Sequence, residues 1–275
     1  MPQAAPTTDA AEVIDATCPN DDAGASQSLS PTAGSLSSAA SRTRNPDDLG
    51  NSRNWLLRGL DPGGLQRLGP YCEPVWLAAG EALGHVGGPL SHVYCPVTAA
   101  IALVARADEV AGLQVALVGR EGVFASPVTE WPPVSPLNAV VRASGWTWRV
   151  GADAFRIELG RSPRLRAMVD CYFHELLMEA TRISACTRFH GLEARLARWL
   201  LTLSDRLGCT AYPLRVQVMA EMLGAPRAGV AQATVELRRR GLIRYGRGRV
   251  AIVDARTLEQ SACSCYQQPV PAGDR

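Results

Sequence analysis

The chain contains no lysine, so all 28 of its basic residues are arginine. Aromatic residues are also few, at 6% of the total, and no apolar run approaches the roughly 18 residues that a membrane-spanning helix needs. The N-terminus lacks the basic-then-apolar order of a secretory signal, so we expect a cytoplasmic protein with no membrane segment. A GC-rich genome explains the arginine bias as readily as a need for guanidinium groups does.

Eight cysteines are scattered along the 275 residues, and no two have the C-x-x-C spacing of zinc ribbons or thioredoxin-like sites. In a cytosolic protein such cysteines are more often small buried side chains than disulfides. Cys263 and Cys265 form a C-x-C pair, but the sequence offers no recognisable partner ligands. The predicted strands also lack a metal-ligand cluster, a phosphate-binding loop and a nucleophile–base pair. We therefore expect no metal, no cofactor and no enzymatic activity.

Residues 1–50 are rich in Ala, Ser, Thr, Pro and Asp and contain no aromatic residue. Seven acidic residues against two arginines give this segment a net charge of −5. A stretch of this composition buries too little apolar surface to offset the entropy lost on ordering. We predict that residues 1–50 are disordered, and we assign residues 267–275 to a disordered tail.

Residues 51–162 are predicted to form a small β domain, preceded by short helices around 55–60 and 65–68. Brief β-like runs follow one another, separated by Gly and Pro. Several short strands at such spacing are typical of a sandwich or a barrel. The expected strands are 73–77, 92–95, 100–105, 113–118, 138–143 and 147–150.

One long helix is predicted from Pro163 to Phe189, because this stretch contains no Gly and no internal Pro. Ser162 is suited to cap it, with Pro163 at its first position. Apolar residues recur along the helix at alternating steps of four and three, as in a coiled coil. This face either packs on the chain's own domains or pairs with a second copy, and we favour a homodimer with residues 163–190 at its interface. The expected dimerisation residues are Leu165, Val169, Tyr172, Leu176 and Ile183.

Residues 214–252 have the pattern of a winged helix-turn-helix. Apolar residues at helical spacing predict a first helix that ends at Gly224, since glycine readily adopts the left-handed conformation of a C-cap. A second helix is predicted over 227–240. Its buried face is expected to carry Val230, Val235 and Leu237. Two short strands joined around 246–248 then predict a basic hairpin, the wing. We assign residues 191–266 to this domain, whose second helix would fit the DNA major groove.

Positive charge is concentrated in this C-terminal region. Residues 191–260 contain twelve arginines and six acidic residues, a net charge of +6, whereas the whole chain carries only +2. Binding to DNA phosphates requires such a concentration of positive charge around the motif. The charge distribution therefore agrees with the motif in predicting double-stranded DNA as a partner.

A β-roll, a long helix and a winged helix-turn-helix in this order resemble the Crp/Fnr (catabolite activator/FNR) superfamily of bacterial transcription regulators. The most similar stretches are 81–94, 117–122, 195–201 and 219–252, within an overall resemblance over 51–266. The resemblance implies an α+β fold with a cyclic-nucleotide-binding-like β-roll, a long dimerisation helix and a C-terminal winged helix-turn-helix. It implies a homodimeric, sequence-specific transcription regulator, which would contact RNA polymerase if it is an activator. The alternative is a β-roll small-molecule-binding protein or enzyme that uses the winged domain for protein interaction.

The resemblance also implies which residues contact DNA. Arg227 falls on the family's guanine-reading arginine, with a phosphate contact as the alternative. Ala228 and Gly229 stand where the family often has Glu and a phosphate-binding Ser or Thr, and Gln232 replaces a later Arg and could pair with adenine. Gly229 lowers helix stability. Close approach of the backbone to DNA is one explanation for a glycine here, and drift is another.

The other expected DNA-binding residues are Gln217, Arg238, Arg247 and Arg249. For Arg238, at the helix end, interaction with the helix dipole is an equal alternative.

In the activator branch of this family, a Glu binds the ribose hydroxyl and an Arg-Ser pair binds the cyclic phosphate. Here Arg120 takes the position of the Glu, and Leu137-Asn138 replaces the Arg-Ser pair. Without that cation a buried phosphate would remain unpaired, which is costly. We therefore expect that the β-roll does not bind cAMP, unless Arg142 has taken over the phosphate contact.

Overall fold

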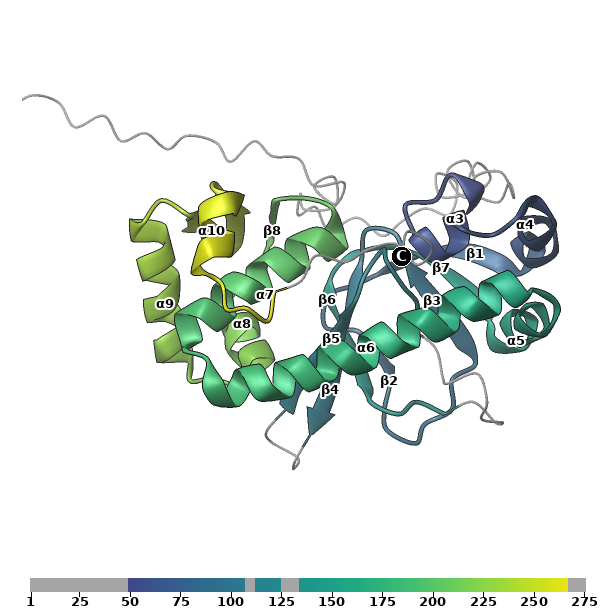
Figure 1. Cartoon of the computed structure of the whole chain (residues 1–275), viewed down its shortest axis with the longest axis horizontal. Coiled ribbons are helices and arrows are strands. Elements are labelled where there is room, and N and C mark those ends of the chain that lie inside the picture. The colour runs from purple at the N-terminus through teal and green to yellow at the C-terminus, as the bar shows by residue number, and fades with distance from the viewer. Residues whose placement is uncertain (1–48, 107–111, 125–133, 267–275) are drawn as a thin grey trace, which may run out of the picture.

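The computed structural model describes residues 49–106, 112–124 and 134–266. The segments predicted to be disordered, 1–50 and 267–275, lie outside these ranges except for Leu49 and Gly50, and Leu49 is buried in the core. A β-roll and a winged domain lie at opposite ends of the molecule, and the long helix α6 (Pro163–Phe189) runs alongside both (Figure 1). None of the described helices is both long and apolar enough to cross a lipid bilayer.

The β-roll consists of two antiparallel sheets. Its strands are β1 (Cys72–Leu77), β2 (Ala82–Gly84), β3 (His92–Pro96), β4 (Ala100–Arg106), β5 (Gly112–Val118), β6 (Asn138–Ala143) and β7 (Gly145–Gly151). One sheet has the order β2-β6-β4-β5 and the other the order β1-β7-β3. Apolar side chains such as Ile101, Val141, Trp148 and Val150 form the core of the roll. The sequence predicted all of these strands except the short β2.

Short helices flank the β-roll. They are α3 (Trp55–Arg58), α4 (Pro62–Leu68) and the 3-10 helix η2 (Gly69–Tyr71) before it, and α5 (Ala152–Arg161) after it. Asn54 caps α3, and its Nδ2 donates to the carbonyl oxygens of Pro96 and Gly122 at 2.9 and 2.8 Å. One buried side chain therefore holds the N-terminal helices against the roll.

The winged domain contains both predicted helices of the motif and both predicted strands. Its elements are α7 (Leu192–Leu207), β8 (Ala211–Pro213), α8 (Val216–Leu223), α9 (Arg227–Arg239), β9 (Ile243–Gly246), β10 (Arg249–Ile252) and α10 (Ala255–Ser261). The strands form a sheet of order β8-β10-β9. Gly224 has a φ of 56° and its N–H donates to the carbonyl oxygens of Ala220 and Glu221, which confirms the predicted left-handed C-cap.

Helix α6 has the predicted bounds, and the Ser162 hydroxyl accepts a hydrogen bond from the Leu165 N–H at 3.2 Å. The predicted dimerisation residues, however, point into the chain's own core. Leu165, Val169, Tyr172 and Ile183 are buried, and Leu176 packs half-buried against the β-roll core. The chain itself covers the face of α6 that carries these residues, so in the described structure they are not exposed to a second copy.

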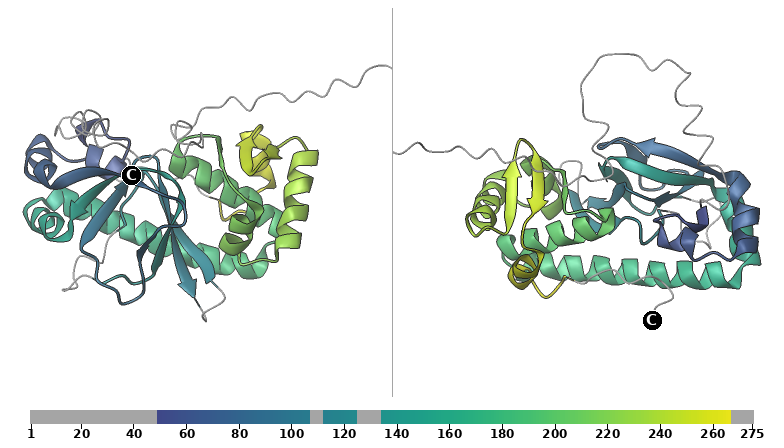
Figure 2. Two further views of the ribbon diagram at one scale, coloured as in Figure 1. Left: turned by 180° about the vertical axis from the view of Figure 1, so that it is seen from behind. Right: turned by 90° about the horizontal axis from the view of Figure 1, so that it is seen from above.

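The opposite side of α6 is open to solvent. We call this surface the outer stripe; it comprises Ala167, Cys171, His174, Leu177, Met178, Thr181 and Ala185, all exposed. Leu177 is 65% exposed and Met178 40%. The β-roll and the winged domain both lie on the same side of α6, so neither covers the stripe (Figure 2, right). Two seams with similar spacing thus follow α6, one facing inward and one facing outward.

The winged domain packs directly on the outside of the β-roll. Ala102 of β4 and Leu117 of β5 belong to one buried cluster with Trp199 of α7. The Trp199 indole N–H donates to Gln114 Oε1 at 3.3 Å. Burial of apolar side chains from both parts in one cluster fixes the contact between them.

A buried ion cluster joins the β-roll, α6 and the winged domain. Arg206 of α7 donates through Nη2 to Glu179 Oε2 of α6 at 2.9 Å, and its Nη1 is 3.4 Å from Glu121 Oε2 after β5. Burial raises the pKa of Glu121, and the charge of Arg206 acts in the opposite direction. Glu179, which interrupts the apolar series of α6, is therefore the residue through which α6 holds α7.

Candidate nucleic-acid interface

Helix α9 lies at the end of the molecule, with one side packed on the winged domain and the other open (Figure 1). Arg227, Ala228, Gln232 and Val235 are exposed and recur at helical spacing along the open side. Val235 is 52% exposed, so its predicted place on the buried face is wrong. An open helix face that begins with an arginine has the form needed to enter a DNA major groove.

The first turn of α9 can receive an anion. Pro226 is the N-cap of this helix, and no side chain caps its first N–H groups. Uncapped N–H groups at a helix N-terminus attract phosphates through their hydrogen-bonding capacity and the helix dipole. Arg227, the first helical residue, adds a full positive charge at the same end.

Gly229 has a structural explanation that the sequence did not suggest. A Cβ atom at this position would lie 3.0 Å from Leu192 Cδ2 of α7. The missing side chain therefore allows α9 to pack closely on α7. Approach to DNA is not needed to explain this glycine, although its backbone N–H remains in the uncapped first turn.

The wing is a tight hairpin with an arginine at its tip. Arg247 and Gly248 connect β9 to β10 with φ angles of 50° and 73°. Two positive φ values in a two-residue loop match the twist of antiparallel strands. The Leu214 N–H donates to the Gly248 carbonyl oxygen at 2.7 Å, which holds the tip beside the start of α8. Arg247 is exposed, while Arg249 is half-buried at the start of β10.

The arginines at the end of α9 differ in their surroundings. Arg239 Nη2 forms an ion pair with Glu236 Oε1 at 2.8 Å, and Arg240 Nη1 forms one with Glu193 Oε1 at 2.7 Å. Arg238 is exposed and has no ion-pair partner within the part of the chain that the structure describes. Of the three, Arg238 is therefore the one most available to a phosphate.

Gln217 connects the helix-turn-helix to the β-roll. Its exposed side chain donates through Nε2 to Glu221 Oε1 at 3.0 Å, and Glu221 Oε2 lies 3.7 Å from Arg142 Nη1 of β6. Burial lowers the pKa of Arg142, and Glu221 acts against this shift. Arg142 thus serves the contact between the two parts, and the structure does not support the alternative that it contacts a ligand phosphate inside the roll.

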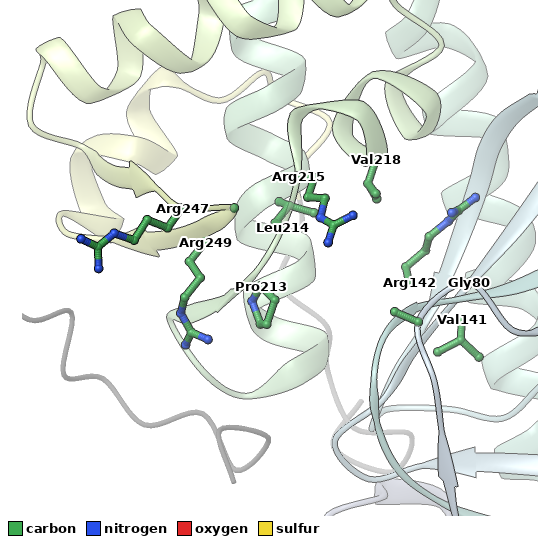
Figure 3. A pocket seen from close by; sticks show the side chains of 11 residues that line it. Gly80, Val141, Arg142, Pro213, Leu214, Arg215, Val218, Arg247 and Arg249 are labelled. Carbon is green, nitrogen blue, oxygen red and sulfur yellow. The ribbon is translucent and has the colours of Figure 1, made fainter. Parts of the chain in front are cut away.

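Beside this contact, a cleft of about 470 Å³ lies between the β-roll and the winged domain. Gly80, Val141 and Arg142 line one wall, and Pro213, Leu214, Arg215, Val218, Arg247 and Arg249 are among the residues opposite. Figure 3 shows that the side chains of Arg247 and Arg249 extend away from Arg142. Because these guanidinium groups do not converge, the cleft lacks the geometry of a built anion site.

The residues at the family's cyclic-nucleotide positions make contacts within the chain. Arg120 Cζ lies 5.7 Å from the centre of the Trp55 ring, and the guanidinium lies against Gly208 of the winged domain. Leu137 packs half-buried against the β-roll core, and Asn138 opposes Val104 in the sheet. Arg120 is thus held by contacts within the chain, and Leu137 and Asn138 carry no charge. These three positions therefore offer no free cation to a cyclic phosphate.

Comparison with known proteins agrees with this geometry. Residues 194–261 match the Crp-like helix-turn-helix domain. The CRP-like cAMP-activated global transcriptional regulator of Mycobacterium tuberculosis is 21% identical over 218 residues, which cover 77% of this chain and 97% of that protein. The chain thus carries a Crp-like helix-turn-helix domain and is similar over most of its length to Crp/Fnr transcription regulators.

The fold of this chain is shared by solved structures of transcription regulators. FixK2 from Bradyrhizobium japonicum is 17% identical, covers 70% of this chain and 98% of its own, and has a TM-score of 0.60. A CRP-family transcriptional regulator from Thermus thermophilus is 18% identical, covers 70% and 99%, and has a TM-score of 0.58. The chain is a DNA-binding transcription regulator of a family that typically dimerises, and the alternative of an enzyme is wrong.

Proposed function

We propose that this protein is a Crp/Fnr-type homodimer that regulates transcription in the cytoplasm by inserting α9 of each copy into the major groove of a specific DNA sequence. The observation that carries the proposal is the open face of α9 beside an exposed arginine wing. In this proposal residues 51–162 form a sensor-like domain, 163–190 the dimerisation helix and 191–266 the DNA-binding domain. An activator of this kind would also contact RNA polymerase.

Sequence readout is assigned to four side chains of α9. Arg227 can donate two hydrogen bonds to guanine O6 and N7, and Gln232 can pair with adenine N6 and N7. Val235 and Ala228 are apolar and exposed, so they suit the methyl group of thymine. Val235 adds one residue to the predicted reading face, beyond Gln232 and toward the C-terminus of the helix.

Phosphate contacts are assigned to groups at the edges of this face. They are the first-turn N–H groups of α9, including that of Gly229, and the side chains of Gln217, Arg238, Arg247 and Arg249. Such contacts set the register of the protein on DNA and carry little sequence information. Gln217 would have to exchange its bond to Glu221 for a phosphate oxygen, so DNA binding would alter a contact next to Arg142.

Dimerisation is assigned to the outer stripe of α6. Along the stripe, Ala167, Cys171, His174, Met178 and Thr181 alternate in steps of four and three, as a two-helix seam requires. A two-fold axis along this seam would present two α9 helices to half-sites about one helical turn, roughly 34 Å, apart. A symmetric operator would then mirror the symmetry of the dimer.

Arg227→Ala is expected to lower the affinity for the operator by about 1–3 kcal/mol and to remove the preference at one base pair of each half-site. The physical reason is the loss of two hydrogen bonds to a single guanine. Fluorescence anisotropy on the operator, and on operators with that base pair changed, measures both effects.

Arg247→Asn is the matched control for this experiment. Asparagine tolerates a positive φ, so the wing turn is retained while one charge is lost. Its affinity should fall alike on all sequences, with a salt slope reduced by about one unit. An Arg227→Ala variant that lost equal affinity on operator and random DNA would instead assign Arg227 to a phosphate.

We also infer that the β-roll does not respond to cAMP, since Arg120, Leu137 and Asn138 are engaged within the chain. A ligand at ten times its dissociation constant stabilises a fold by about 1.4 kcal/mol, which shifts the melting temperature measurably. We expect no shift of melting temperature with millimolar cAMP. A clear shift that the Arg120→Ala variant lacked would contradict this inference.

A further inference from the structure

Four side chains with metal-binding donor atoms meet at the junction of α6, α7 and the C-terminal segment. They are Cys186 and His190 at the end of α6, and Cys263 and Cys265 after α10. One donor atom from each lies within 4.8 Å of every other. The Sγ atoms of Cys186 and Cys263 are 3.4 Å apart, and Cys265 Sγ is 3.5 Å from His190 Nδ1.

Backbone contacts hold the two contributing segments in place. The N–H of His190, the C-cap of α6, donates to the Cys186 carbonyl oxygen at 3.1 Å, so the two residues lie one helical turn apart at the end of the helix. The Cys263 N–H donates to the Ala194 carbonyl oxygen of α7 at 3.3 Å, and the Tyr266 hydroxyl donates to Asp205 at 2.8 Å. The donor atoms are therefore brought together by the fold itself.

We propose that Cys186, His190, Cys263 and Cys265 bind one zinc-type divalent cation in a tetrahedral site. Three thiolates and one imidazole are a recurring ligand set of structural zinc sites. With Zn–S bonds of about 2.3 Å, the ligand atoms of a regular tetrahedron are about 3.8 Å apart, within the spacing found here. Thiolate ligands also disfavour magnesium and calcium, which prefer oxygen.

An iron–sulfur cluster fits these positions less well. In such a cluster the cysteines bind different iron atoms, so their sulfur atoms surround a group of several iron and sulfide ions and lie farther apart. Here all four donor atoms surround one point, which suits a single ion.

Two buried arginines supply charge around the site. Arg195 and Arg198 are buried, their Nε atoms have no hydrogen-bond partner in the described structure, and Arg195 interacts electrostatically with Cys186 and Cys263. A divalent cation with three thiolates and a neutral imidazole carries a net negative charge, which these guanidinium groups would balance.

The position of the site gives the ion a mechanical effect. His190 is the last residue before the turn between the dimerisation helix α6 and helix α7 of the winged domain. A metal bound there would fix the angle between them and tie the C-terminal segment to both. DNA binding, which depends on how a dimer presents its two α9 helices, would then depend on the ion.

Full-length protein purified without a histidine tag or chelators tests this proposal through its metal content. We expect about one zinc ion per chain by mass spectrometry of the metal. Cys265→Ser and His190→Ala should each reduce the zinc retained after dialysis against a chelator by at least about tenfold. Cobalt bound in place of zinc should show the absorption of a tetrahedral thiolate complex, which the two variants should lose.

Cys72→Ala is the matched control, because Cys72 lies in the β-roll core and burial raises its pKa to about 12. It should retain zinc like the wild type. Zinc far below one ion per chain in the wild type, zinc unaffected by the ligand variants, or a Cys186–Cys263 disulfide in its place would overturn the proposal. Zinc is measured without DNA, so this outcome is independent of the DNA-binding proposal.

Discussion

Leu177→Asp is expected to convert the protein into a monomer and to weaken its binding to a two-fold operator by on the order of 100- to 10,000-fold. Leu177 is 65% exposed on the outer stripe, and in the proposed dimer it packs against the partner's α6. An aspartate there would bury an unpaired charge in an apolar interface. The monomer would present a single α9 and lose the second, linked contact. Light scattering and fluorescence anisotropy on the same samples measure both changes.

Val86→Asp is the matched control for this substitution, because Val86 is 60% exposed and lies in the β-roll rather than on α6. It should leave both the dimer and the DNA affinity unchanged. Leu176→Asp should behave differently again, since Leu176 packs toward the core and its replacement should lower the free energy of unfolding. A Leu177→Asp protein that remained dimeric at micromolar concentration would contradict the assignment of the outer stripe.

Arg206→Met is expected to lower the free energy of unfolding by about 3–5 kcal/mol. The variant would leave Glu121 and Glu179 buried without their shared cation. Removing one partner from a buried ion cluster costs far more than replacing the whole cluster by neutral groups. Urea denaturation at a fixed protein concentration measures the loss. Because the cluster joins the three parts of the chain, we expect DNA affinity to fall as well.

The pH dependence of this loss identifies its cause. Burial already raises the pKa of Glu121 above its ordinary value of 4.5, and loss of Arg206 should raise it further. Ionised Glu121 then opposes folding at neutral pH, whereas below about 4.5 it is protonated in both states and the effect disappears. The difference between variant and wild type should therefore shrink as the pH falls.

Two companion variants complete this test. Adding Glu121→Gln and Glu179→Gln to Arg206→Met should recover most of the stability. Arg239→Met removes a solvent-exposed ion pair instead and should change stability little. A loss for Arg206→Met that was equal at all pH values would show that packing of the arginine side chain, rather than its charge, holds the cluster.

The order of the elements could be predicted from the sequence, whereas the partner of each helix face could not. Helix α6 carries an inner seam through Leu165, Val169 and Tyr172 and an outer seam through Cys171, His174 and Met178. Both have the four–three spacing of a coiled coil, and the inner one is richer in apolar residues. Its apolar content predicts the inner seam as the dimer interface, whereas in the structure this seam packs against the chain's own core. A surface that pairs only with a second copy need not be the most apolar.

Candidate site residues could be predicted where they lie close together in the sequence, but not where the fold brings distant residues together. Arg227 and Arg247 could be placed from the helix-turn-helix pattern because they lie within it. The helical pattern predicts Val235 on the buried face because it is apolar, but the structure exposes it, and a base-reading face can use an apolar side chain. The ligands that complete the Cys263–Cys265 pair come from the end of α6, more than 70 residues away, and no local spacing signals them.

Selection of bound fragments from the organism's own genome tests the central claim most directly. The purified full-length protein should recover fragments that share an inverted repeat, with half-site centres about one helical turn apart. The Arg227→Ala variant should lose that enrichment at one base pair of each half-site. Fragments no richer in any common sequence than the input, or a single half-site without its inverted copy, would contradict a homodimer that reads DNA through α9.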